Sequence, residues 1–180
     1  MRILGVDPGY AIVGFGVLEY TGTTFTPITY GAITTAAETP FLRRLESIYR
    51  DFRTLIQQYH PDCVAMERLY FTSNQKTVID VAQARGVLML TAQLEQIPVS
   101  EYTPLQVKQA VVGYGRAEKK QVMELTRRIL KLQKIPKPDD AADALAIAIC
   151  HGHCATGLQG RMHHHFHPVP QRQQRDDRRD

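Results

Sequence analysis

Four carboxylates stand where elements of secondary structure are expected to begin or end. Asp7 and Glu67 each follow directly on a short apolar run, and Asp140 and Asp143 lie three residues apart at the start of a stretch with helical periodicity. That spacing places both aspartates on one face of a helix. Acids packed together repel one another unless cations neutralise them, and carboxylate oxygens suit Mg²⁺ or Mn²⁺. Two such ions about 4 Å apart can activate a water and stabilise the leaving oxygen of a phosphodiester.

Each acid also has a structural alternative. Asp7 precedes a Pro-Gly pair, so it could simply open a turn. Asp140 and Asp143 could cap a helix and complement its dipole. Glu67, directly after a buried strand, has little structural use, although an ion pair with Arg68 stays open. The joint placement of all four at element ends favours chemistry.

Hydrophobic periodicity predicts the elements that must position these acids. Strands are expected at residues 2–7, 14–20, 25–34, 63–66 and 99–102, and helices at 40–59, 76–96, 104–112, 118–132 and from 139 or 140 to 149. Threonines before two prolines are expected to cap the first and third helices. The order βββαβαβααα indicates an α/β sheet with mixed strand directions. If the first and fourth strands are neighbours, Asp7 and Glu67 lie side by side, and the last helix can bring the other acids against them.

The helix expected at 76–96 is apolar on more than one face. One face can cover the sheet, which leaves another for a second subunit.

Composition sets the class of protein. With 180 residues, 43% hydrophobic and 22% charged, the chain is expected to form one globular domain over residues 1–155. Residues 156–180, rich in His, Arg and Gln, are expected to form a weakly ordered tail. Three cysteines are too few for a disulfide framework, and neither a signal-peptide core nor a membrane-spanning run is expected. These features favour the cytoplasm.

Positive charge is concentrated in one window. The net charge is +4, but between Tyr102 and Lys134 eight basic side chains face two acidic ones. Such a cluster favours a polyanionic partner. The structural alternative is a basic helix face that is simply exposed to solvent.

Six segments, taken in order, resemble the RuvC family of Holliday junction resolvases. They are ILGVDPG at 3–9, MER at 66–68, QARG at 83–86, QVKQ at 106–109, VVGYG at 111–115 and DAADALA at 140–146. No single segment is decisive, but the ordered set is specific and spans about residues 1 to 154.

The resemblance implies an RNase H-like fold, an α/β architecture with a mixed five-stranded sheet flanked by helices. It also implies a homodimer that nicks two opposed strands of a four-way DNA junction in recombination and repair. Asp7, Glu67, Asp140 and Asp143 would be both the catalytic and the metal-binding acids. Two Mg²⁺ ions per site, with Mn²⁺ as a substitute, would activate the water that leaves a 5′-phosphate and a 3′-hydroxyl. A junction-binding and branch-migration motor of the RuvA and RuvB type would be a partner.

The resemblance and the charge pattern also nominate DNA contacts. The candidates are Tyr70, Phe71, Arg85, Lys108, Lys119 and Lys120. The lysines would bind backbone phosphates, which gives salt-dependent affinity without sequence reading. The aromatics would stack on unpaired bases or, alternatively, pack beneath their loop. The arginine would reach DNA or only make an ion pair within its helix.

Three rival functions remain to be weighed. Residues 5–9 also resemble the first phosphate loop of actin- and sugar-kinase-like ATPases, but those proteins bind ATP between two domains, and this chain is long enough for only one. Four intact acids argue against a non-catalytic junction-binding protein. Ribonuclease H and resolvase-like RNA nucleases share the acids, whereas residues 111–115 and the basic helix after them favour the junction resolvase.

Overall fold

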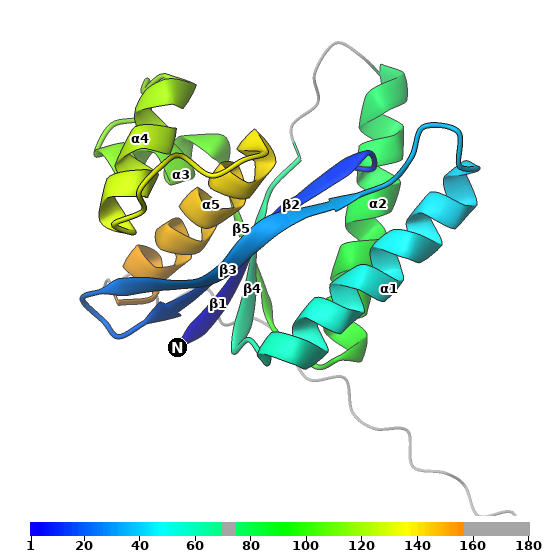
Figure 1. Ribbon diagram of the computed structural model, residues 1–180, viewed down its shortest axis with the longest axis horizontal. Coiled ribbons are helices and arrows are strands. Elements are labelled where there is room, and N and C mark those ends of the chain that lie inside the picture. Colours follow the sequence, from blue (N-terminus) through cyan, green and yellow to red (C-terminus); the bar gives the residue numbers. More distant parts are fainter. Residues whose placement is uncertain (70–74, 157–180) are drawn as a thin grey trace, which may run out of the picture.

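A five-stranded mixed sheet separates two layers of helices (Figure 1). The computed structural model describes residues 1–69 and 75–156. The strands are β1 (Arg2–Asp7), β2 (Ile12–Tyr20), β3 (Phe25–Thr34), β4 (Cys63–Glu67) and β5 (Val99–Tyr102). The helices are α1 (Phe41–Tyr59), α2 (Gln75–Leu94), α3 (Pro104–Val112), α4 (Lys119–Ile129) and α5 (Asp139–Thr156).

The strand order is β3-β2-β1-β4-β5, with β1 at the centre. The first three strands form the expected antiparallel meander, and β4 and β5 run parallel to β1 and to each other. The sheet therefore has mixed strand directions, and the condition on which the sequence argument depended, that β1 and β4 are neighbours, is met. As a result, Asp7 and Glu67 lie side by side at the carboxyl ends of two neighbouring parallel strands.

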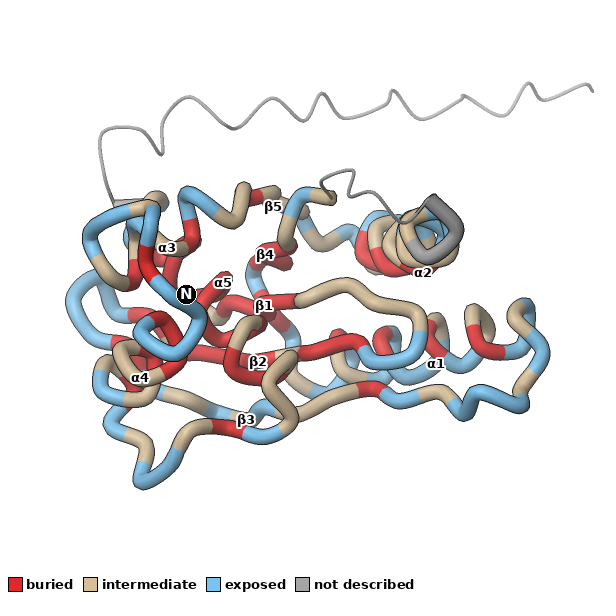
Figure 2. Tube along the Cα trace, turned by 90° about the horizontal axis from the view of Figure 1, so that it is seen from above, coloured by how far each residue is buried: buried red, intermediate tan, exposed pale blue. Residues whose placement is uncertain are grey.

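Each face of the sheet has its own apolar core, because side chains alternate along a strand. Leu4 of β1 packs in a cluster with Phe52 of α1 and Leu88 of α2. Ile3, its neighbour, belongs to the other cluster, with Leu145 of α5. Figure 2 shows α1 and α2 on one side of the sheet and α5 on the other, with α3 and α4 beyond it. The two helical layers are thus built on opposite side-chain sets of the same strands.

The register of β1 against β4 decides which face the acids occupy. Val6 pairs with Met66, so Asp7 and Glu67 are the next residues on neighbouring strands. Ala65 belongs to the core on the α5 side. Because residues two apart share a face, Glu67 lies on the α5 side as well. The two acids therefore face the helix that carries the others.

Three glycines let α5 approach the sheet at backbone distance. A Cβ at Gly14 would overlap the carbonyl of Asp140, and a Cβ at Gly5 would overlap the carbonyl of Ala144. A Cβ at Gly16 would meet the Leu145 side chain at 2.6 Å. Any larger residue at these positions would lift the amino-terminal half of α5, and with it the acids that α5 carries.

The far end of α5 is held by a buried polar cluster. His151 Nδ1 lies 2.8 Å from the Tyr102 hydroxyl, and His151 Nε2 lies 3.1 Å from Cys63 Sγ. The cluster ties the helix to the end of β5 and the start of β4. Since a buried polar group is costly without a partner, these contacts fix the position of α5 along the sheet.

Most expected boundaries are confirmed, and the differences have local causes. Thr103 forms the expected cap, because its hydroxyl accepts from the Gln106 N–H at 3.1 Å and the Gln106 side chain accepts from the Thr103 N–H at 2.8 Å. The cap expected from Thr39 is wrong: Pro40 occupies the N-cap position of α1 and no side chain caps it. The last helix continues past residue 149 to Thr156, because the His151 cluster gives its final turns a buried face.

The expected tail lies outside the described residues from 157 onward. No helix within residues 1–69 and 75–156 is long and apolar enough to cross a membrane.

Replacing Gly14 by alanine tests the close approach of α5. The new Cβ must displace the Asp140 carbonyl, so we expect the free energy of unfolding to fall by about 1–3 kcal/mol. Urea titration measures it. Gly31→Ala is the matched control, because the Cβ there meets only the Phe15 ring, at 3.1 Å, and a ring can move. Equal effects of the two substitutions would contradict a special role for the α5 contact.

Candidate active site

The four acids predicted from the sequence share one electrostatic environment. Asp7 and Glu67 end β1 and β4, while Asp140 and Asp143 lie in the first turns of α5. The pKa of Asp7 is raised to about 8, mainly by burial and then by the charges of Glu67, Asp143 and Asp140 in that order, while Lys119 opposes the rise. Burial alone would raise this pKa, but the added effect of the other carboxylates requires that they lie close to Asp7. The fold therefore assembles the acids that the sequence singled out.

Two of the other acids, Glu67 and Asp143, also have raised pKa values and so ionise less readily. Burial raises the pKa of Glu67, and the charge of Asp143 adds to this effect. Burial likewise raises the pKa of Asp143, with the charges of Asp140 and Asp139 contributing, while Lys119 opposes the rise. In the absence of a cation the cluster favours protons, and a bound cation would shift each group toward its ionised form.

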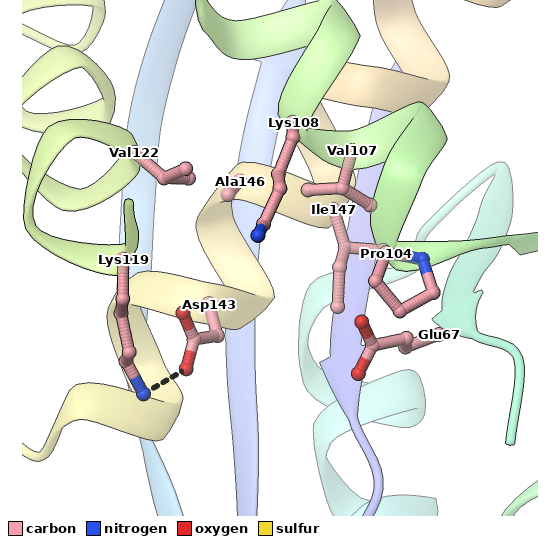
Figure 3. A pocket seen from close by; sticks show the side chains of 9 residues that line it. All are labelled: Glu67, Pro104, Val107, Lys108, Lys119, Val122, Asp143, Ala146 and Ile147. Carbon is pink, nitrogen blue, oxygen red and sulfur yellow. Dashed lines mark ion pairs between the residues drawn. The ribbon is translucent and has the colours of Figure 1, made fainter. Parts of the chain in front are cut away.

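Lys119 supplies the positive charge nearest to the acids. Its ammonium group lies 2.8 Å from Asp143 Oδ2 (Figure 3). The hydrogen bond raises the pKa of Lys119, and the charges of Asp143, Asp139 and Asp7 contribute. Lys119 is the first residue of α4, so the basic helix starts at the site. A side-chain cation therefore neutralises part of the negative charge of the acids.

The acids have the chemical type of ligand that a hard divalent cation prefers, but their arrangement is not a preformed metal site. Within residues 1–69 and 75–156, no three His, Cys, Asp or Glu side chains converge into a ready-made metal site. The donors are nevertheless carboxylate oxygens, which are the ligands that Mg²⁺ and Mn²⁺ prefer. Lys119 engages Asp143 Oδ2 and so would compete with a bound cation for this carboxylate.

Asp139 differs from the acid that follows it. Its carboxylate pairs with Lys137 at 2.6 Å, and that hydrogen bond lowers the pKa of Asp139. Asp140, in contrast, raises the pKa of Asp7. Asp139 therefore acts on Asp143 but not on Asp7, whereas Asp140 acts on both, and Asp140 as a site residue stays a prediction.

A cavity of about 280 Å³ opens beside the acids (Figure 3). Glu67 and Asp143 line one side, and the side chains of Lys108 and Lys119 point toward it from α3 and α4. The remaining lining residues are apolar: Pro104, Val107, Val122, Ala146 and Ile147. Two of the predicted DNA-contacting lysines therefore meet two of the acids around one cavity, while Lys120 is exposed and does not line it.

The other predicted DNA contacts are placed differently. The Arg85 guanidinium pairs with Glu101 of β5, and its Nε lies 3.4 Å from the carbonyl oxygen of Glu67. The ion pair was the alternative left open by the sequence, although the partner lies on a strand and not within the helix. Tyr70 and Phe71 lie outside the described residues.

Glu101 is the residue that sequence reasoning missed. It sits in β5 beside Met66 of β4. The available signal was the alternation of β5, which puts Glu101 on the face opposite Tyr102 and therefore toward α2.

Comparison with known proteins gives a consistent result. The family model described as crossover junction endodeoxyribonuclease RuvC matches residues 3–151. The protein of that name from Clostridioides difficile strain 630 is 57% identical over 153 residues, which cover 85% of this chain and 90% of the relative. The one from Caldanaerobacter subterraneus is 54% identical over 159 residues, covering 88% and 96%.

Solved structures agree with this grouping. A Thermus thermophilus RuvC structure matches with a TM-score of 0.80 and 32% identity, covering 86% of this chain and 95% of the other. T. thermophilus RuvC in complex with Holliday junction substrate matches with a TM-score of 0.81 and 29% identity, covering 88% and 98%. The α/β architecture, a mixed five-stranded sheet flanked by helices, is thus the RNase H-like fold expected from the sequence. This chain belongs to the RuvC family of crossover junction endodeoxyribonucleases.

Proposed function

We propose that this protein resolves four-way DNA junctions in recombination and repair by nicking two opposed strands. The observation that carries the proposal is the cluster of Asp7, Glu67, Asp140 and Asp143 at one edge of the sheet, in a member of this family. One similar structure is described as a complex with Holliday junction substrate, which supports the choice of substrate.

The reaction is hydrolysis of a phosphodiester. Water attacks the phosphorus in line, the bond to the 3′ oxygen breaks, and the products carry a 5′-phosphate and a 3′-hydroxyl. We propose two Mg²⁺ ions, replaceable by Mn²⁺, held by the four acids. When bound, the ions supply Lewis acidity to activate the water and stabilise the leaving oxygen. The raised pKa of Asp7 supports a site at which a bound cation would stabilise the carboxylate and release its proton to solvent.

Lys108, Lys119 and Lys120 are proposed to bind DNA backbone phosphates. The first two line the cavity beside the acids, and the third follows on the exposed surface of α4. A phosphate that attracts Lys119 also releases Asp143 from its ion pair, so substrate binding and completion of the acid cluster are linked. Stacking of Tyr70 and Phe71 on unpaired bases remains a proposal that rests on the family resemblance.

A homodimer would place one site on each of two like strands, because its two-fold symmetry can match that of the junction. The surface of α2 supports this assembly. Its exposed stripe consists of Ile79, Ala82, Gln83, Gly86, Leu90, Gln93 and Leu94. Ile79, Leu90 and Leu94 are 58%, 58% and 61% exposed, which is unusual for large apolar side chains on one helix face. A second copy of α2 would bury this stripe.

Two further proposals rest on family membership alone. The protein would work in the cytoplasm of a bacterium, as the relatives are bacterial. A junction-binding and branch-migration motor of the RuvA and RuvB type would position it on DNA.

Cleavage should depend on Asp7 and on junction structure. With Mg²⁺, the wild type should place symmetric nicks in a synthetic four-way junction while leaving linear duplex and RNA–DNA hybrid intact. Asp7→Asn should slow nicking by about a hundredfold or more, because a cluster acid is lost. Junction binding, measured by gel shift, should survive. Retained cleavage in this variant, or equal cutting of the RNA–DNA hybrid, would contradict the proposal.

Metal-free stability should respond to pH through Asp7. Folding raises the pKa of this group from 3.8 to about 8, so ionisation costs stability as pH rises from about 4 to about 8 and no more beyond. Asp7→Asn removes that cost. In EDTA, the melting temperature of the variant should therefore exceed that of the wild type by a margin that grows over this range, and Mg²⁺ should shrink the margin. Asp51→Asn, on exposed α1 surface, is the control and should show no such trend.

The α2 stripe should carry the dimer. Leu90→Glu would bury charge between two copies, so we expect monomers by analytical ultracentrifugation and loss of paired nicking. Leu42→Glu is the matched control, because Leu42 is 77% exposed on α1 and lies outside the stripe. A dimer that survives Leu90→Glu, or dissociates equally in the control, would refute this interface.

A further inference from the structure

Arg85 reaches the active site from behind the sheet. It projects from α2, and its guanidinium forms an ion pair with Glu101 of β5. The side chains of this pair are only 15% and 30% exposed. The Nε atom of Arg85 also lies 3.4 Å from the carbonyl oxygen of Glu67, at the end of β4. One cation therefore links a helix, a strand and the backbone of a catalytic acid.

The strand register shows why these groups meet. Glu101 pairs with Met66, and Tyr102 pairs with Glu67. Because side chains alternate, Glu101 faces α2 together with Val99, while Tyr102 faces α5. The side chain of Glu67 thus points to the cavity on the α5 side, and its main chain is held from the α2 side.

Such a contact matters most at a strand end. Glu67 is the last residue of β4, and the Arg68 N–H makes one further ladder bond to the Tyr102 carbonyl, at 2.8 Å. Strand ends open locally more easily than strand centres. The orientation of the Glu67 carboxylate depends on its backbone, so a backbone anchor here also orients the acid.

The ion pair is more than a surface contact. Burial lowers the pKa of Arg85, and the nearby charge of Arg68 contributes, yet a guanidinium remains charged in proteins. A largely buried cation of this kind needs its anion, because removing one partner leaves the other uncompensated. Glu101 thereby holds the guanidinium where it can reach the Glu67 carbonyl.

We infer that Arg85, held by Glu101, is a positioning residue that orients Glu67 through its backbone and does not contact DNA. The inference rests on the proposed function only for its activity measurement. It predicts that loss of Arg85 impairs the chemical step while substrate binding is unchanged.

The test compares Arg85→Met, Arg85→Lys and Glu101→Gln with the wild type. Under single-turnover conditions with Mg²⁺, nicking of a four-way junction should fall about 10- to 100-fold in Arg85→Met, since a misplacement near 1 Å can cost a hundredfold. Glu101→Gln should fall in the same direction, and the double variant should be no slower than Arg85→Met, because the two residues act as one unit. Arg85→Lys should recover part of the rate, since it keeps the charge without the fork.

Two binding measurements separate positioning from DNA contact. Without metal, the junction Kd of Arg85→Met should stay within about twofold of the wild type, and its salt dependence should be unchanged. A weaker Kd, together with a salt slope reduced by about one, would identify a phosphate contact and overturn the inference. An unchanged nicking rate in both Arg85→Met and Glu101→Gln would overturn it as well.

A third measurement does not depend on activity. Hydrogen exchange at the Arg68 amide should accelerate about tenfold or more in Arg85→Met, because the strand end loses its anchor. Arg53→Met is the matched control: Arg53 of α1 pairs with Glu95 at 2.6 Å on the same side of the sheet, but Glu95 precedes the start of β5, whereas Glu67 pairs with Tyr102 at the end of that strand. It should change neither the rate nor the exchange.

If Arg85→Met does not fold, Glu101→Gln, a neutral isostere, carries the same predictions. A wild type that fails to nick junctions refutes the proposed function, whereas unchanged exchange at Arg68 refutes the positioning role.

Discussion

The contact between α5 and the glycines of β1 and β2 is the constraint on which the rest of the structure depends. Backbone meets backbone at Gly5 and Gly14, so the helix has one permitted height above the sheet. The His151 cluster at its far end removes sliding along the sheet. The acids come from three separate elements, and only this seating makes them neighbours. Close packing, which resists a change of even one methylene group, here fixes the positions of the acids as well as stabilising the fold.

The acid cluster is an unfavourable arrangement that the fold maintains. Burial and mutual repulsion raise the pKa values of Asp7, Glu67 and Asp143, while Lys119 partly offsets them. The chain therefore reaches its folded state with a proton and an ammonium group where divalent cations are proposed to bind. Both can leave, since protons exchange and a lysine side chain is flexible. Apart from the two acids, Lys108 and Lys119, the residues that line the cavity are apolar.

How far the sequence predicts this protein depends on whether a feature follows from local pattern. Strand ends, the Thr103 cap and the helical spacing of Asp140 and Asp143 are local, and the structure has them where they were expected. The pairing of Lys119 with Asp143 and of Arg85 with Glu101 depends on how distant elements pack, so charge and periodicity could name the residues but not their partners. The Thr39 cap was wrong by one residue: α1 begins at Phe41, so Pro40 and not Thr39 occupies the N-cap position.

The pairing of Val6 with Met66 has a consequence for how the gene can change length. Side chains along a strand alternate, so the face on which Glu67 appears is a matter of odd or even count. Deleting or inserting one codon within β4 would turn the carboxylate toward α1 and α2, even if every remaining residue were kept. Two codons would restore the face but move the acid out of step with Asp7. At the buried apolar positions of this segment a substitution that conserves volume is tolerable, whereas a change in residue number is not.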